Sequence, residues 1–242
     1  MNSIEGNNFE NKLEQEPKLI SKVYFIRHGA TDYKEYQVDS QKDITNDLSE
    51  KGEEEIKLVA ETIIKDIDKN IPVRIMSSPR IRTKHSAYIL QEELTEKGIK
   101  LDPSNFTETE SFEGVRTKGD AAEIWTELGE KYGAELDKLW RMNELSEPDK
   151  AESSTELFER IKNSFEQGIR IIRKNEQSGH RDLSQIVLVS HGEIIEGLIA
   201  AYGFRPFYDP ERKFKTGGVG EIKIFSDKVT INYDDFSYTL NI

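Results

Sequence analysis

Two histidines in this sequence end strand-like apolar runs, and each is followed directly by a glycine. Arg27 and His28 close the run VYFI, and Gly29 follows them. His191 closes the run IVLVS, and Gly192 follows it. A single histidine at the end of a strand is usually only a partly buried polar residue. Two histidines at matching positions, with an arginine beside the first, indicate a site rather than packing.

A third apolar run, VRIMSS at residues 73–78, is followed by Arg80 and Arg82. Side chains from three strand ends could therefore meet: two imidazoles, the guanidinium of Arg27, and that of Arg82 or Arg80. Guanidinium groups bind phosphate oxygens in a bidentate manner, and their charge does not titrate away. Such a cluster predicts a pocket for a phosphate-like anion.

The chemistry that suits this cluster is phosphoryl transfer. Gly29 and Gly192 would let the backbone approach a bound group, and helix N-termini beyond them would add N–H donors. An imidazole can attack phosphorus directly as a covalent nucleophile. The leaving oxygen then needs a proton, which a carboxylic acid can supply if burial or nearby negative charge keeps it protonated near neutral pH.

A metal site is the alternative use of two histidines. Together with Asp32 or Glu193 they could bind zinc or iron. The neighbouring arginines would repel a cation, so we expect a phosphate-binding site that holds no metal.

The elements that position these side chains alternate along the chain. Strands are expected at about 22–27, 73–78, 98–101 and 186–190, and helices after a cap at Ser49 or Asp47, from about 79 to 97, and at 119–143, 153–174 and 193–202. Residues 102–118 are expected to be irregular, and EIKIFSDKVTINY to form a hairpin. This pattern predicts an α/β fold, a three-layer α/β/α sandwich with a mostly parallel central sheet and a small helical cap insertion. In such folds ligands bind beyond the carboxyl ends of the strands, where both His-Gly pairs fall.

Composition limits the class of partner and the compartment. The 242 residues carry a net charge of −12, which argues against nucleic acid or an anionic membrane as the main partner. The absence of cysteine excludes disulfides and fits a reducing cytoplasm. No segment approaches the roughly 20 apolar residues of a membrane span, and the first 20 residues do not resemble a signal peptide. We expect a cytoplasmic protein with a flexible tail at 1–20 and one catalytic domain at 21–242, whose cap insertion lies at about 112–150. Its oligomeric state stays open.

Five stretches together resemble a known family. FIRHGAT, LSEKGEEE, SSPRIRTKHSA, AESSTELFERI and VLVSHGEII are similar, in order and spacing, to the histidine phosphatase superfamily of phosphoglycerate mutase-like proteins. The resemblance covers roughly residues 22–200. It implies an enzyme that hydrolyses a small phosphorylated molecule through a phosphohistidine intermediate, without a metal or cofactor.

The resemblance also implies roles for individual residues. His28 matches the nucleophile of the RHG motif, and Arg27 and Gly29 match its phosphate-binding residues. Arg82 matches the second phosphate-binding arginine. His191 matches the second histidine, which steadies the transferring phosphoryl group.

The proton donor implied by the family is a glutamate after the strand near residue 100. LDPSNFTE resembles the family element that carries it, which selects Glu108. Glu110 is the rival, because the segment that follows is short and the register could slip by two residues.

Two features depart from the family pattern. The stretch RHGATDYKEYQ lacks an asparagine that many relatives carry, and Glu196 stands where the helix after SHG usually has an arginine. Both departures imply substrate contacts unlike those of well-known members, and the first favours a phosphatase over a phosphoglycerate mutase. We keep the mutase as an alternative beside a non-catalytic phospho-ligand-binding module. Arg80 is expected to be a solvated residue at the start of a helix. Arg116, Lys118 and Arg141 are expected to be solvated surface charges, with contact to a second anionic group of the substrate as the alternative.

Overall fold

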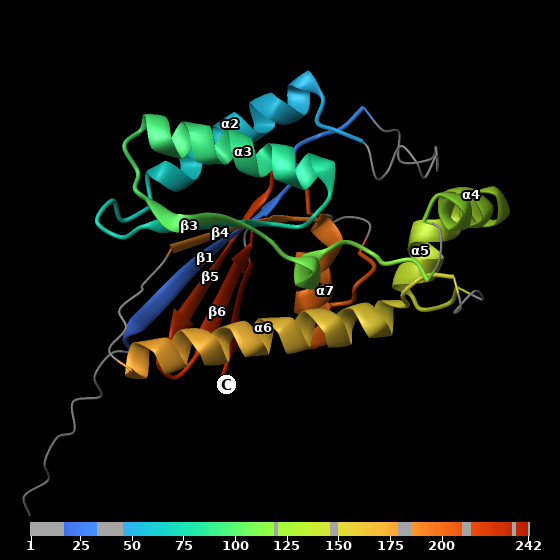
Figure 1. Ribbon diagram of the computed structural model, residues 1–242. Coiled ribbons are helices and arrows are strands. Elements are labelled where there is room, and N and C mark those ends of the chain that lie inside the picture. Colours follow the sequence, from blue (N-terminus) through green and yellow to red (C-terminus); the bar gives the residue numbers. More distant parts are fainter. Residues whose placement is uncertain are drawn as a thin grey trace, which may run out of the picture.

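A computed structural model of the chain describes residues 17–32, 46–118, 121–145, 150–178, 185–209, 214–233 and 236–241. Within these ranges a seven-stranded sheet lies between two pairs of helices (Figure 1). The α/β class and the layered sandwich predicted from the sequence are confirmed.

The sheet has the strand order β3-β2-β4-β1-β5-β6-β7. The strands are β1 Leu19–Arg27, β2 Val73–Ser77, β3 Leu101–Glu108, β4 Gln185–Ser190, β5 Val219–Phe225, β6 Val229–Tyr233 and β7 Phe236–Leu240. The four strands β3, β2, β4 and β1 pair in parallel, whereas β5, β6 and β7 pair antiparallel and include the predicted hairpin. The carboxyl ends of the parallel strands therefore lie along one edge of the sheet.

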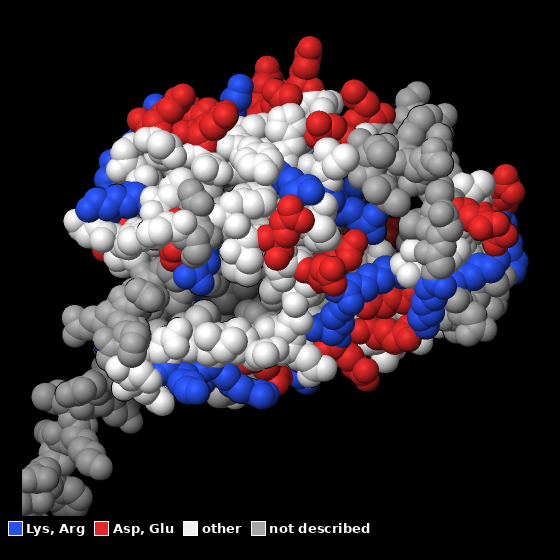
Figure 2. Space-filling view, viewed as in Figure 1, with Lys and Arg blue, Asp and Glu red and all other residues white. Residues whose placement is uncertain are grey.

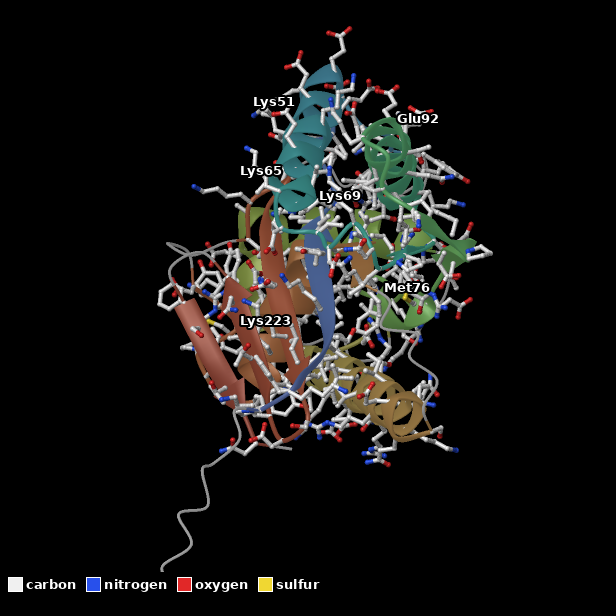
Figure 3. All side chains as sticks on the ribbon, turned by 90° about the vertical axis from the view of Figure 1, so that its left-hand side faces the viewer. Lys51, Lys65, Lys69, Met76, Glu92 and Lys223 are labelled. Carbon is white, nitrogen blue, oxygen red and sulfur yellow. The ribbon has the colours of Figure 1, made fainter. Side chains whose placement is uncertain are left out.

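Helices cover both faces of the sheet, as Figure 3 shows from the side. They are α2 Glu50–Ile64 and α3 Ile81–Glu96 on one face, and α6 Ser154–Gln177 and α7 Gly192–Ala201 on the other. Side chains of β1 alternate between the two layers, because successive residues of a strand point to opposite faces. Phe25 packs in the cluster with α6 and α7, and Ile26 packs in the cluster with α2 and α3.

Serine side chains fix the starts of two of these helices. Of the two predicted caps for α2, Ser49 is used, and its hydroxyl accepts from the Gly52 N–H at 3.2 Å. Ser153 and Glu156 form a reciprocal capping box at the start of α6.

The third strand differs from the prediction. A strand was expected at 98–101 and an irregular segment at 102–118, but β3 extends to Glu108 and a short 3-10 helix, η1, spans Glu110–Phe112. Pro103 makes this sequence look irregular, because a proline has no backbone N–H to donate to a neighbouring strand. It is tolerated here because β3 is an edge strand with an irregular register.

The segment between β3 and α6 carries its own helices. The expected helix at 119–143 is divided into α4 Ala121–Tyr132, a 3-10 turn η2 Gly133–Glu135 and α5 Leu136–Arg141. Gly133 has a φ of 50°, a conformation that favours glycine and interrupts the helix. A small apolar cluster of Ile124, Leu128, Leu136 and Ala151 holds these helices together. Figure 1 shows α4 and α5 set apart from the sheet.

Candidate active site

The structure brings the two histidines together at the carboxyl edge of the sheet. Arg27 and Ser190 pair in register at the ends of β1 and β4, so the next residues, His28 and His191, are neighbours. Their ring centroids lie 5.3 Å apart with the ring planes at 70°. Both side chains are buried, and the His28 N–H donates to the Ser190 carbonyl at 3.0 Å.

The contacts of His28 define its tautomer. Its Nδ1 lies 2.8 Å from the carbonyl oxygen of Gly29, which can only accept, so Nδ1 carries the proton. Its Nε2 accepts from Arg82 Nε at 3.2 Å and therefore presents its lone pair. Burial, followed by the charges of Arg82 and Arg27, lowers the pKa of His28 well below 6.5. The result is a neutral imidazole whose unprotonated Nε2 accepts from Arg82, and an imidazole nitrogen that carries a lone pair is the form that a nucleophile needs.

A chain of hydroxyl groups orients His191. Thr83 Oγ1 lies 2.9 and 2.7 Å from the carbonyls of Ser78 and Arg80, so its proton is donated to a carbonyl and it accepts from Ser78 Oγ at 3.0 Å. Ser78 Oγ then accepts from His191 Nε2 at 2.8 Å. Burial, and then the positive charge of Arg82, lower the pKa of His191 well below 6.5. Both site imidazoles are thus neutral near pH 7.

Arg27 is held from two sides. Its Nη1 donates to the Phe214 carbonyl, and its Nε is buried without a hydrogen-bond partner among the described residues. A Cβ added at Gly192 would lie 3.2 Å from Arg27 Cδ, so a larger residue there would displace the arginine. A half-buried guanidinium with an unused donor is suited to capturing an anion.

Gly29 is required for close packing. A Cβ added at Gly29 would lie 2.2 Å from the Gly52 carbonyl oxygen at the start of α2. The Gly29 N–H donates to Ser86 Oγ at 3.3 Å, so it is already engaged and does not point freely toward a ligand. The expectation that Gly29 binds phosphate stays a prediction.

Arg80 is not the solvated residue that the sequence predicted. Its side chain is only 13% exposed and pairs with Glu113 at 3.1 Å, and its charge contributes to lowering the pKa of His191. Glu113 also lies 3.7 Å from Arg116. No motif in the sequence marks Glu113, although it directly precedes Gly114, where an added Cβ would lie 3.4 Å from His191 Cδ2.

The two candidate proton donors lie at the carboxyl end of β3, on the same edge of the sheet as the histidines. Glu108 is the last residue of β3, and Glu110 begins η1. Glu108 is in register with Ser77 and lies 3.4 Å from Lys84, with its side chain 49% exposed. Glu110 is 83% exposed and lies 4.0 Å from Arg116. Glu108 is therefore the better shielded of the two, and the choice between them stays a prediction.

The charges around the two histidines favour the binding of an anion. Figure 2 shows acidic side chains gathered over α2 and α3, whereas Arg27, Arg80 and Arg82 lie near the histidines. Across the described ranges there is no group of three or more His, Asp or Glu side chains placed to hold a metal ion. In the same part of the chain, no helix is both long and apolar enough to cross a membrane.

Comparison with known proteins points in the same direction. The sequence profile of the histidine phosphatase superfamily (branch 1) matches residues 23–232. Among curated proteins, none gives a significant match to the sequence.

Several solved structures share the fold. A mycobacterial glucosyl-3-phosphoglycerate phosphatase is 19% identical, with 84% of this chain and 90% of that one covered and a TM-score of 0.56. A putative alpha-ribazole-5'-P phosphatase from Escherichia coli is 16% identical, with 92% and 95% covered and a TM-score of 0.53. A phosphoglycerate mutase from Bacillus anthracis is 18% identical, with 92% of both chains covered and a TM-score of 0.57.

Proposed function

Because the chain belongs to the histidine phosphatase superfamily, we propose that it is a metal-independent phosphatase that hydrolyses phosphomonoesters of small molecules through a phosphohistidine intermediate. The observation that carries this proposal is the state of His28, a buried neutral imidazole whose Nε2 lone pair faces the guanidinium of Arg82. The residues that act on the two histidines are arginines, whose positive charge would repel a metal ion, and this supports metal independence. The absence of cysteine supports a cytoplasmic location.

In the first half-reaction Nε2 of His28 attacks phosphorus. The N–P bond forms as the bond to the leaving oxygen breaks, and the electron pair leaves with that oxygen. Glu108 in its acid form then protonates the alkoxide. Arg82 moves its donor from Nε2 to a phosphoryl oxygen, where Arg27 also stabilises the developing charge. His191 contributes to this stabilisation once its Nε2–H turns from Ser78 to a phosphoryl oxygen.

In the second half-reaction water attacks the phosphohistidine. The Glu108 carboxylate accepts a proton from the water, and the N–P bond breaks with its electron pair returning to Nε2. Phosphate is released, and both His28 and Glu108 regain their starting states. The carbonyl of Gly29 keeps the Nδ1 proton in place throughout.

Hydrolysis of an aryl phosphate, measured in the presence of EDTA, tests this mechanism. We expect wild-type turnover to persist without metal, His28→Ala to lose at least about a thousandfold in kcat, and Glu108→Gln about a hundredfold or more. Glu110→Gln should stay near wild type, and His85→Ala, a histidine of α3 that pairs with Asp47, is the matched control. His28→Ala with wild-type turnover would refute the proposal.

The mutase and the binding module give different results. A mutase would isomerise a phosphoglycerate, in the presence of a bisphosphorylated primer, faster than it hydrolyses it. A binding module would take up phosphate without ever forming acid-labile phosphohistidine.

A further inference from the structure

The peptide of Phe214 connects two charged side chains. Its N–H donates to Glu196 Oε1 at 2.5 Å, and its carbonyl accepts from Arg27 Nη1. The Phe214 ring is fully buried and packs edge-on against Phe25 at 5.9 Å. Glu196 of α7 therefore fixes the group that in turn fixes the phosphate-binding arginine of β1.

The residues after Phe214 also bind the carboxyl end of β1 through backbone hydrogen bonds. The Arg27 N–H donates to the Gly218 carbonyl at 3.0 Å, and the Gly217 N–H donates to the His28 carbonyl at 3.2 Å. A shift of Phe214 would thus act on Arg27 through the backbone as well as through the carbonyl.

The second oxygen of Glu196 binds the cap segment. Glu196 Oε2 lies 2.6 Å from Arg141 Nη1, and the two side chains are 4% and 11% exposed. Arg141 ends α5, which Figure 1 shows apart from the sheet, and it also pairs with Asp137 and lies over the Phe207 ring. The expectation that Arg141 is a solvated charge is wrong, because burial against Phe207 and the pair with Glu196 remove it from solvent.

We propose that Glu196 is a positioning residue that aims the Arg27 guanidinium at the phosphoryl group through the Phe214 peptide, while Arg141 neutralises the charge of this buried carboxylate. The inference rests on the proposed function, since it assigns Arg27 to the phosphate. Glu196 stands where the family pattern usually has an arginine, so this arrangement belongs to the residues of this chain.

Two double variants separate positioning from simple ion-pair stability. Glu196→Leu/Arg141→Met and Glu196→Gln/Arg141→Met both remove the buried charges, and replacing a buried ion pair by apolar groups is often tolerated. They differ only in the acceptor offered to the Phe214 N–H. Arg170→Met, an exposed arginine of α6, is the control for loss of a guanidinium.

The measurement is the affinity for inorganic phosphate, by calorimetry, together with the thermal midpoint. We expect the Leu/Met variant to bind phosphate about tenfold more weakly, and the Gln/Met variant and Arg170→Met to stay within about threefold of wild type. In an Arg27→Lys background, which removes the guanidinium fork, the change from Gln to Leu at residue 196 should alter the affinity less than about twofold.

Each outcome is decisive. Equal affinity of the two double variants, or the same tenfold difference in the Arg27→Lys background, would overturn the inference, because Glu196 would then not act through Arg27. Phosphate binding with the expected pattern but no turnover by wild type would refute the proposed function alone. A wild-type protein that neither binds phosphate nor turns over would refute both.

Discussion

At the scale of single residues, the proposed chemistry depends on the protonation states of the two histidines. His28 is expected to be protonated on Nδ1, because the Gly29 carbonyl lies 2.8 Å away, and His191 on Nε2, because that atom donates to Ser78. Opposite tautomers leave opposite ring nitrogens with a lone pair. Only His28 then offers Nε2 as a nucleophile.

Nitrogen-15 NMR of the imidazole rings tests this assignment. At pH 6.5 an ordinary histidine is half protonated, whereas we expect His28 and His191 to give the shifts of neutral rings, with the proton on Nδ1 and Nε2 respectively. Spectra of His28→Gln and His191→Gln assign the signals. A charged imidazolium for His28 at this pH, or a proton on its Nε2, would contradict the geometry.

The sequence predicted which residues meet at the sheet edge better than which residues pair with one another. His28 and His191 could be placed together because a parallel sheet brings its strand ends to one edge. The pair of Arg141 and Glu196 could not be predicted, because it joins residues 55 positions apart and depends on how the cap packs against α7. The same holds for Arg80 and Glu113, whose contact depends on the path of the chain after β3.

At the scale of elements, Arg160 ties α6 to the segment beside the site. Its guanidinium binds both carboxylate oxygens of Glu152 at 2.7 Å and donates to the carbonyls of Ser111, Glu113 and Gly114 at 2.9 to 3.1 Å. This segment packs directly on His191, so one buried arginine holds the loop that covers the second histidine.

Arg160→Met is expected to be strongly destabilising. It would leave three carbonyls without their Arg160 donor and remove the ionic partner of the buried Glu152 carboxylate, which keeps the Arg116 N–H at 3.3 Å. This loss costs about 3–5 kcal/mol. Urea denaturation measures the loss, with Arg170→Met as the control, because an exposed pair of α6 contributes less than about 1 kcal/mol. A loss below about 1 kcal/mol for Arg160→Met would show that the loop is held by other contacts.

At the scale of the whole molecule, the fold keeps two neutral histidines among arginines inside an acidic protein. The net charge is −12, yet the groups that act on the histidine pair are Arg27, Arg80 and Arg82. These positive charges oppose protonation of the imidazoles, and in the proposed mechanism the same charges stabilise a bound phosphoryl group. Because the two histidines resist protonation only in the folded chain, the free energy of unfolding depends on pH.

This linkage predicts acid destabilisation in a defined window. The folded histidines have pKa values well below 6.5, lowered first by burial and then by Arg82, whereas the unfolded chain titrates near 6.5. Below pH 6.5 the unfolded state binds more protons, so the free energy of unfolding falls as the pH falls, by up to about 1.4 kcal/mol per histidine per pH unit. Above pH 6.5 both states are neutral at these positions, and the dependence disappears.

Urea denaturation at pH values from 7.5 to 5 measures this slope. We expect His28→Gln/His191→Gln to flatten it between pH 6.5 and 5, because the variant carries no proton at these positions in either state. Glu156→Gln should leave the slope in this window unchanged, because the hydrogen bonds from Ser153 lower the pKa of Glu156 from 4.5 to about 2, and its contribution is lost only below pH 4.5. If the double histidine variant kept the wild-type slope, the loss of stability would come from other groups, and the two imidazoles could not be the buried neutral pair on which the proposed attack on phosphorus depends.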